Sequence, residues 1–226
     1  MSTARDIFDP SHYASVRKPL PEAKTRPSWC STDPDFGARE VEEIFLKGWV
    51  FICRVDELPE PGDYAAVDTA GGPVIIMRGR DSALHALANS CRHRGTRLLE
   101  GTGNCKRAIK CPYHAWTYDS LGHLIGMPLR DRYPDLDLSK HSLVELPSEE
   151  RHGFVWVVVQ PGVEIDVASH LGELDADLAA MGCDKMTYFN SLPQEPLASN
   201  WKSVSEGLIE ALHLPYVHAD TFALNP

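Results

Sequence analysis

The amino-acid sequence predicts an α+β fold, in which a small antiparallel β-sandwich or barrel is followed by the opening of a mixed α/β region. The first observation is a series of short, strand-sized apolar segments between Trp49 and Gln160, separated by Pro, Gly and Asp. The second is Pro161-Gly162, which marks a boundary. The third is helical patterning beyond that boundary. Closely spaced strands of this kind are typical of a sandwich or barrel.

Residues 1–48 are expected to form an N-terminal arm and one helix. Repeated prolines up to residue 34 interrupt any helix in the arm. Apolar residues at helical spacing in Asp35–Lys47 predict the helix that follows.

Residues 49–160 are expected to form the strand-rich domain. Its strongest strand candidate is the apolar run His152–Gln160, HGFVWVVVQ. The other candidates are WVFICRV (49–55), DYAAVD (63–68), PVIIMRG (73–79) and LHALANS (84–90).

Residues 161–226 are a small allotment for a domain and are expected to be only the beginning of one. The patterns of Val167–Met181 and Asn200–His218 predict helices. Lys185–Leu192 is predicted to be a strand.

Composition narrows the class of protein. Hydrophobic residues make up 43% and charged residues 24%, which is ordinary for a soluble globular protein. The formal net charge of −10 argues against binding of nucleic acid through phosphates. We see neither a run of about 18 apolar residues nor a signal peptide, so we expect no membrane contact and a cytoplasmic location. The six cysteines are then expected to be metal ligands or free thiols.

Two mixed Cys–His pairs form the first constellation, Cys91-x-His93 and Cys111-x-x-His114. A Rieske [2Fe–2S] cluster needs two thiolates on one iron and two imidazoles on the other, and one Cys and one His from each pair supply that set. Structural zinc is the alternative, because two Cys and two His also suit it. Zinc sites usually pair Cys with Cys and His with His, so the mixed pairs favour the cluster.

Acidic residues and histidines in the last predicted helix form the second constellation. At helical spacing, Glu206, Glu210 and His213 stand one above another. Pro215 is expected to break the helix and to let His218 return beside His213. Two histidines and a carboxylate form the facial triad of non-haem Fe(II) oxygenases. An amphipathic helix with two polar histidines is the plain alternative.

The motifs CRHRG and CPYHAWTY, after a strand-rich start, resemble the Rieske domain of ring-hydroxylating oxygenase α subunits. The resemblance covers roughly Trp49–Gln160. A second part of the same family's pattern is filled by Asn200, Trp201, Lys202, Glu206, Glu210, His213 and His218. Gly207 stands where the family often has Asn, and Glu210 stands where it often has Asp.

This resemblance implies a terminal oxygenase of a Rieske-type hydroxylase or demethylase, with a helix-grip-like catalytic domain. An NAD(P)H-linked reductase or a ferredoxin would reduce the [2Fe–2S] cluster. A mononuclear Fe(II) at His213 and His218 would use O₂ to oxidise a small organic substrate. Glu210 would bridge to His114 of a neighbouring subunit in a homotrimer or α/β hexamer. The family's third iron ligand is an Asp far downstream, so the chain resembles the front part of a longer subunit.

A Rieske electron carrier without oxygenase chemistry is the alternative function, although such a carrier has no need of the pattern in Asn200–His218. Cys105 matches no ligand position, and Trp116 and Tyr118 are expected to pack around the cluster loops. A basic patch is interpreted either as a solvated loop or as a docking surface for an electron donor. It consists of Arg94, Arg97, Lys106 and Arg107.

Overall fold

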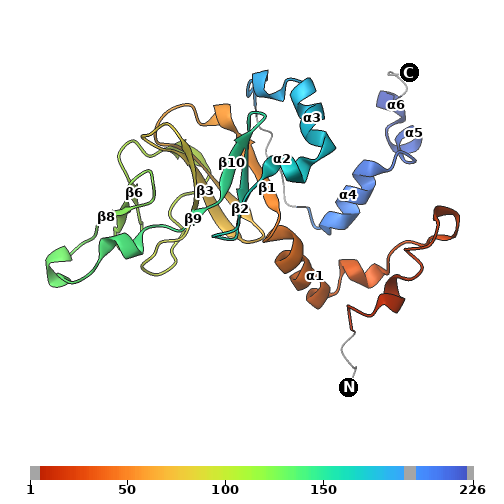
Figure 1. Cartoon of the computed structure of the whole chain (residues 1–226), viewed down its shortest axis with the longest axis horizontal. Coiled ribbons are helices and arrows are strands. Elements are labelled where there is room, and N and C mark those ends of the chain that lie inside the picture. Colours follow the sequence, from red (N-terminus) through yellow and green to blue (C-terminus); the bar gives the residue numbers. More distant parts are fainter. Residues whose placement is uncertain (1–5, 191–196, 223–226) are drawn as a thin grey trace. The chain divides into compact units, whose positions relative to one another are not determined.

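The computed structural model describes residues 6–190 and 197–222 of the chain (Figure 1). The chain divides into two compact units. One consists of Met1–Glu40 together with Ser191–Pro226, and the other of Val41–Asn190. The predicted domain boundaries at residues 48 and 160 stay a prediction.

The unit of residues 41–190 is built on antiparallel strands, as the sequence predicts. Three sheets have the strand orders β1-β11-β10, β5-β2-β3-β4-β9 and β6-β7-β8. The strands are β1 (Trp49–Arg54), β2 (Asp63–Thr69), β3 (Gly72–Arg78), β4 (Leu84–Ala88), β5 (Thr102–Asn104), β6 (Ile109–Lys110), β7 (Thr117–Tyr118), β8 (Leu124–Gly126), β9 (Glu145–Leu146), β10 (Ser148–Arg151) and β11 (Phe154–Val158).

The helices flank the strands in the sequence, because α1 precedes β1 and the other helices follow β11 (Figure 1). They are α1 (Pro34–Glu40), α2 (Val167–Leu171), α3 (Glu173–Ala180), α4 (Trp201–Ile209), α5 (Leu214–Val217) and α6 (Ala219–Phe222). A π-helical turn, Val41–Phe45, follows α1. Short 3₁₀ turns cover Pro10–Tyr13, Leu20–Glu22, Ser28–Ser31, Val55–Glu57, Arg130–Arg132, Leu138–His141 and Cys183–Lys185.

Strand β3 is central to the core and is buried on both of its faces. Ile75 and Met77 point into a hydrophobic cluster that also contains Cys91 and Cys111. Val74 and Ile76 point into a second cluster, which includes residues of β1 and β11. Because side chains alternate between the faces of a strand, the continuous apolar run of β3 places one sheet between two layers.

The predicted helix Val167–Met181 is present but divided. Gly172, at a φ of 56°, ends α2 and precedes α3. Arg151, at the end of β10, and His152, in the turn before β11, contact Asp175 in α3, with the His152 Nε2 atom 2.7 Å from Asp175 Oδ1. Hydrogen bonds from Arg151 and then from His152 lower the pKa of Asp175. This ion-pair cluster joins α3 to the sheet.

Two predictions about the last part of the chain were wrong. Lys185–Leu192 is not a strand, because Cys183–Lys185 forms a 3₁₀ turn and the residues up to 190 have no regular structure. Residues 191 and 192 lie outside the described residues. Asn200–His218 is not one helix, since α4 ends at Ile209 and α5 begins only at Leu214. No helix in the described part is long and apolar enough to cross a membrane.

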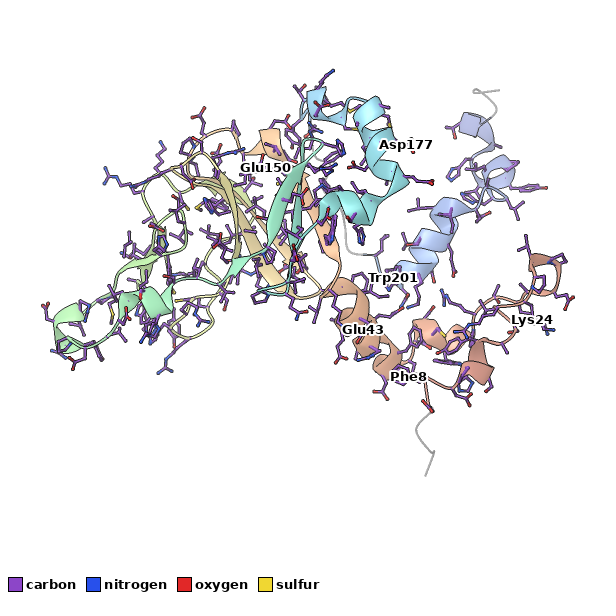
Figure 2. The ribbon with its side chains drawn as sticks, in the orientation of Figure 1. Phe8, Lys24, Glu43, Glu150, Asp177 and Trp201 are labelled. Carbon is purple, nitrogen blue, oxygen red and sulfur yellow. The ribbon has the colours of Figure 1, made fainter. Side chains whose placement is uncertain are left out.

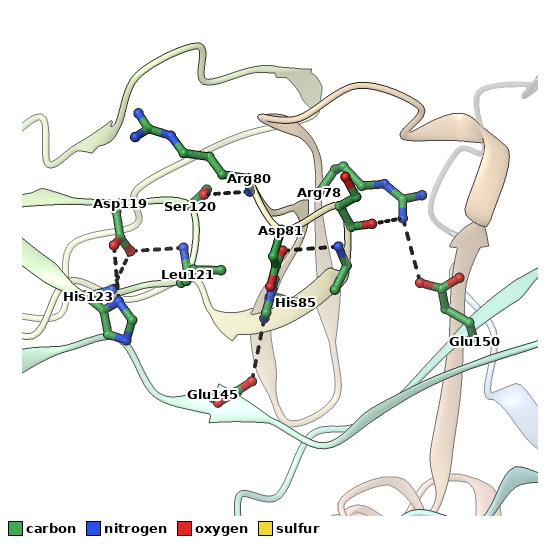
Figure 3. A network of polar contacts seen from close by, with 12 residues as sticks. Arg78, Arg80, Asp81, His85, Asp119, Ser120, Leu121, His123, Glu145 and Glu150 are labelled. Carbon is green, nitrogen blue, oxygen red and sulfur yellow. Dashed lines mark hydrogen bonds and ion pairs between the residues drawn. The ribbon is translucent and has the colours of Figure 1, made fainter.

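The tip of the β3–β4 hairpin is joined to the β7–β8 turn by polar contacts (Figure 3). The backbone N–H of Arg80 donates to Ser120 Oγ at 3.3 Å. Asp119 closes the β7–β8 turn, because its Oδ1 accepts the N–H groups of Leu121 and His123 at 3.0 and 2.8 Å. These contacts hold the small sheet that supports the second Cys–His loop.

Candidate metal centres

The first Cys–His loop leaves β4 and is closed by its own backbone. The N–H of Cys91 donates to the carbonyl of Thr96 at 2.9 Å, and the N–H of Gly95 donates to the carbonyl of Cys91 at 2.8 Å. Gly95 has a φ of 68°, in the left-handed region that glycine adopts without steric cost. The loop therefore turns back within six residues, with His93 at its tip.

The second loop, between β6 and β7, repeats this construction. The N–H of Cys111 donates to the carbonyl of Trp116 at 2.8 Å, and the N–H of Ala115 donates to the carbonyl of Cys111 at 3.0 Å. Ala115 occupies the position of Gly95 and has a φ of 54°. The two loops thus share a hydrogen-bond pattern and a left-handed residue four places after the cysteine.

The four predicted ligands divide into a buried half and an exposed half. Cys91 and Cys111 are each 3% exposed and belong to one hydrophobic cluster. His93 and His114 are exposed, with ring centroids 4.6 Å apart and rings at 74°. A [2Fe–2S] cluster with its thiolate-bound iron inside and its imidazole-bound iron outside requires this division.

Tyr118 is completely buried beside Cys91 and does more than pack. Its hydroxyl oxygen lies 3.3 Å from Cys91 Sγ and accepts the N–H of Arg92 at 3.1 Å. The pKa of Tyr118 is raised, mainly by burial and next by the hydrogen bond with Cys91. The protonated hydroxyl can therefore donate to the sulfur, which in its thiolate form is only an acceptor.

Trp116 and His93 form a stacked pair. Their ring centroids are 5.0 Å apart and their planes differ by 11°, while Trp116 itself is 7% exposed. The pKa of His93 is lowered, first by partial desolvation and then by electrostatic interactions with His114 and Arg94. A lowered pKa favours the neutral imidazole, which is the form that binds metal.

Asn89 is a supporting residue that the sequence analysis missed. Its side chain is completely buried, and its Oδ1 accepts the N–H groups of Leu98 and Leu99 at 2.9 and 3.0 Å. Its Nδ2 also donates to the carbonyl of Leu99 at 2.7 Å. An asparagine at the end of an apolar strand could have indicated this role, because a buried amide needs hydrogen-bond partners.

An apolar hollow of about 840 Å³ lies beside the exposed imidazoles. Tyr113, whose ring centroid is 3.8 Å from that of His114, forms part of its wall. The residues between β8 and the 3₁₀ turn Leu138–His141 that line it are Met127, Pro128, Leu129, Tyr133 and Leu136. In the predicted basic patch, Arg97 is paired with Asp68.

The second constellation is only partly arranged as predicted. Glu210 has an extended backbone after the end of α4, so Glu206, Glu210 and His213 do not share a helix face. Glu210 Oε2 accepts the N–H of Leu212 at 2.6 Å, and a side chain that binds nearby backbone competes with the helix. The break therefore comes before Pro215, which sits at the start of α5 where proline is tolerated.

His213 and His218 do come together, as the sequence analysis expected. Their ring centroids are 5.3 Å apart and their planes are at 72°. His213 Nδ1 is hydrogen-bonded to Glu210 Oε1. This hydrogen bond from His213 is the largest cause of a lowered pKa at Glu210. Glu206 points elsewhere and pairs with Arg26.

Among residues 6–190 and 197–222, no three His, Cys, Asp or Glu side chains converge as ligands for a single ion. This result does not conflict with a [2Fe–2S] cluster, because that cluster divides its four ligands two and two between its irons. For His213 and His218, the same result means that no described carboxylate completes a triad with them.

Residues 48–145 match the Rieske [2Fe–2S] domain family. The chain is 30% identical over 205 residues to the carnitine monooxygenase oxygenase subunit of Escherichia coli (strain K12), covering 87% of this chain and 53% of that protein. It is 33% identical over 192 residues to the glycine betaine monooxygenase oxygenase subunit of Chromohalobacter salexigens, covering 83% of this chain and 42% of that protein. The chain thus spans about half the length of these relatives.

Solved structures agree with these matches. A quaternary ammonium Rieske monooxygenase in complex with L-carnitine has a TM-score of 0.82 and 32% identity, over 90% of this chain and 58% of that one. Naphthalene 1,2-dioxygenase from Rhodococcus sp. has a TM-score of 0.77 and 26% identity, over 87% of this chain and 46% of that one. The chain therefore carries a Rieske [2Fe–2S] domain and is a relative of the oxygenase subunits of Rieske oxygenases.

Proposed function

We propose that the chain acts in the terminal oxygenase of a Rieske-type hydroxylase or demethylase. The observation that carries this proposal is the pairing of His213 with His218, 5.3 Å apart between ring centroids, in the same chain as the Rieske loops. When bound, a [2Fe–2S] cluster would deliver electrons one at a time, and a mononuclear Fe(II) would activate O₂ for substrate oxidation.

In this proposal, Cys91 and Cys111 hold one iron of the cluster, and His93 and His114 hold the other. The buried sulfurs and the exposed imidazoles support this assignment. Electrons would enter and leave at the imidazole side, because that side reaches the surface. The apolar hollow beside the imidazoles, whose lining includes Lys110, offers a surface for a reductase or ferredoxin linked to NAD(P)H.

His213 and His218 are the proposed ligands of the mononuclear Fe(II), and Glu210 orients the first of them. A carboxylate that accepts the Nδ1–H of an imidazole fixes its tautomer and leaves Nε2 for the metal. A carboxylate has about four lone-pair positions, so Glu210 retains capacity for another donor. That capacity supports the expected bridge from Glu210 to His114 of a neighbouring subunit.

An assembly of several subunits, either a homotrimer or an α/β hexamer, belongs to the same proposal. One similar structure, with a TM-score of 0.66 and 35% identity, is of a quaternary ammonium Rieske monooxygenase and concerns inter-subunit electron transfer. Relatives named for carnitine, glycine betaine and anthranilate oxidation differ widely in substrate. The proposal for this chain is accordingly a reaction class.

Two measurements test the proposal. Electron paramagnetic resonance of the reduced protein should show a Rieske signal, and bound zinc without that signal would overturn the cluster assignment. Co(II), added as a probe of the iron site under anaerobic conditions, should bind with visible absorption bands that are lost in His213→Ala and His218→Ala. Binding that is unchanged in both variants would remove the iron site and favour a Rieske electron carrier.

A further inference from the structure

The N-terminal segment holds the first turn of α4 through one carboxylate, that of Glu40 in α1. Lys202 Nζ lies 2.6 Å from both Glu40 oxygens. The indole N–H of Trp201 donates to Glu40 Oε2 at 3.4 Å. Figure 2 marks Trp201 at the beginning of α4. Two successive residues of α4 thus bind the last residue of α1.

Two further contacts strengthen this attachment. Asn200 caps α4, since its Oδ1 accepts the N–H of Lys202 at 3.0 Å, while its Nδ2 donates to the carbonyl of Ser31 at 3.1 Å. Arg26 binds Ser31 Oγ at 2.6 Å and Glu206 Oε1 at 3.0 Å. The arm therefore contacts α4 at its cap, in its first turn and in its second turn.

Burial distinguishes the Glu40–Lys202 pair from an exposed ion pair of the same arm, Lys18–Glu22. The side chains of Glu40 and Lys202 are 9% and 11% exposed, whereas those of Lys18 and Glu22 are 54% and 68% exposed. Lys202 Nζ also lies 5.3 Å from the ring centroid of Phe36. A buried charge that loses its partner is strongly unfavourable, while an exposed pair contributes little.

The Glu40–Lys202 pair lies at the start of α4, the helix that leads to the candidate iron ligands. Helix α4 is nine residues long, and the N–H of Glu210 still bonds to the carbonyl of Glu206 at 3.2 Å. At about 1.5 Å per residue, the helix transmits an orientation over roughly 13 Å. The segment with Glu210, His213 and His218 begins where α4 ends.

We propose that Glu40 and Lys202 are positioning residues for the iron site. By fixing the beginning of α4, the pair sets the place from which the chain enters the ligand segment. The role in metal binding rests on the proposed function, because it assumes that His213 and His218 hold a metal ion. The attachment of α4 to the arm does not rest on it.

The test compares Glu40→Gln with Glu22→Gln, the same change at the exposed pair of the same arm. In Glu40→Gln we expect faster amide hydrogen exchange in residues 201–209 and about tenfold weaker Co(II) binding, with altered visible bands, as for other changes behind a metal ligand. Glu22→Gln should match the wild-type protein in both measurements. Glu40→Asp keeps the charge and should give a smaller loss, so it serves if Glu40→Gln does not fold. The Rieske signal of the reduced protein should stay unchanged in all three.

Three results separate the parts of this inference. Unchanged exchange of α4 in Glu40→Gln would overturn the attachment itself. Faster exchange with unchanged Co(II) affinity and spectrum would make the pair merely structural. If His213→Ala and His218→Ala leave Co(II) binding unchanged, the proposed iron site fails, whereas the exchange measurement still decides whether Glu40 holds α4.

Discussion

The Rieske loops and the Glu210–His218 segment carry the two sets of predicted ligands, and they are supported in different ways. Each Rieske loop is closed by two backbone hydrogen bonds and begins at a buried cysteine. Residues 210–218 consist of an extended residue, a turn and the short helix α5, and His213 is hydrogen-bonded to the carboxylate of Glu210. The Rieske ligands are therefore held by the fold of one unit, whereas His213 and His218 depend on α4 and on whatever supports it.

This difference matters because a metal site is only as well defined as the groups that hold its ligands. Two loops built alike, with their supporting residues, present two sulfurs and two imidazoles within a single compact unit. Two histidines alone lack the anionic oxygen that the facial triad requires. The following predictions test that contrast.

The largest effect is expected from the buried cysteines. Cys91→Ser or Cys111→Ser should abolish the Rieske signal of the reduced protein, because each removes a thiolate from the same iron. Cys105→Ser is the matched control, since Cys105 is half-buried and fits no ligand position. A signal that survives in both ligand variants, or disappears in Cys105→Ser, would contradict the ligand assignment.

In the less supported segment, Glu210→Ala should weaken Co(II) binding about 10- to 100-fold, as loss of a carboxylate behind a metal-binding histidine does. Glu210→Gln retains an oxygen that can accept the Nδ1–H of His213 and should bind nearly as well as the wild-type protein. Its turnover in the assembled enzyme should nevertheless be severely reduced if Glu210 bridges to a neighbouring subunit. Asp220→Ala is the control, and a comparable loss there would identify Asp220 as a ligand.

A smaller effect is expected when support is removed inside the Rieske unit. Tyr118→Phe removes the hydroxyl 3.3 Å from Cys91 Sγ, and a hydrogen bond from this hydroxyl to the sulfur would stabilise the more negative, reduced cluster. If the bond contributes about 1 kcal/mol more in the reduced state, the reduction potential should fall by about 40 mV. Tyr113→Phe is the control, because the ring of Tyr113 is much more exposed than that of Tyr118. This variant should not shift the potential measured by redox titration. A reduction potential in Tyr118→Phe equal to that of the wild-type protein would show that the hydroxyl only packs.

The smallest effect concerns the left-handed residue of each loop, which is glycine in the first loop and alanine in the second. Ala115 has a φ of 54° at the position where the first loop has Gly95. Ala115→Gly should raise the free energy of unfolding by about 0.5–1 kcal/mol, because a left-handed conformation is unfavourable for residues with a Cβ. Ala86→Gly, in the regular strand β4, should lower it by at least a similar amount. Denaturant unfolding of the cluster-loaded protein measures both, and a destabilised Ala115→Gly variant would mean that its methyl group packs favourably.

Support for the Rieske ligands was only partly predictable from the sequence. The spacing of Cys91, His93, Cys111 and His114 suffices to name the cluster, because ligand chemistry restricts the residues that can bind it. The role of the Tyr118 hydroxyl was not predictable, because it acts on Cys91, which is distant in sequence. The same is true of the bond between Glu40 and Lys202, which are 162 positions apart.

By itself, the sequence determined five of the strands of the Rieske unit (β1, β2, β3, β4 and β11), its four candidate ligands and the return of His218 toward His213. These features follow from alternating apolar residues, from ligand spacing and from the short distance between the two histidines, all of which are local. Only the tertiary structure decided that α4 ends at Ile209, that residues 186–190 form no strand and that the two Rieske loops are built alike. Helix ends and isolated strands depend on which neighbour takes each backbone hydrogen bond, and a one-dimensional pattern does not contain that information.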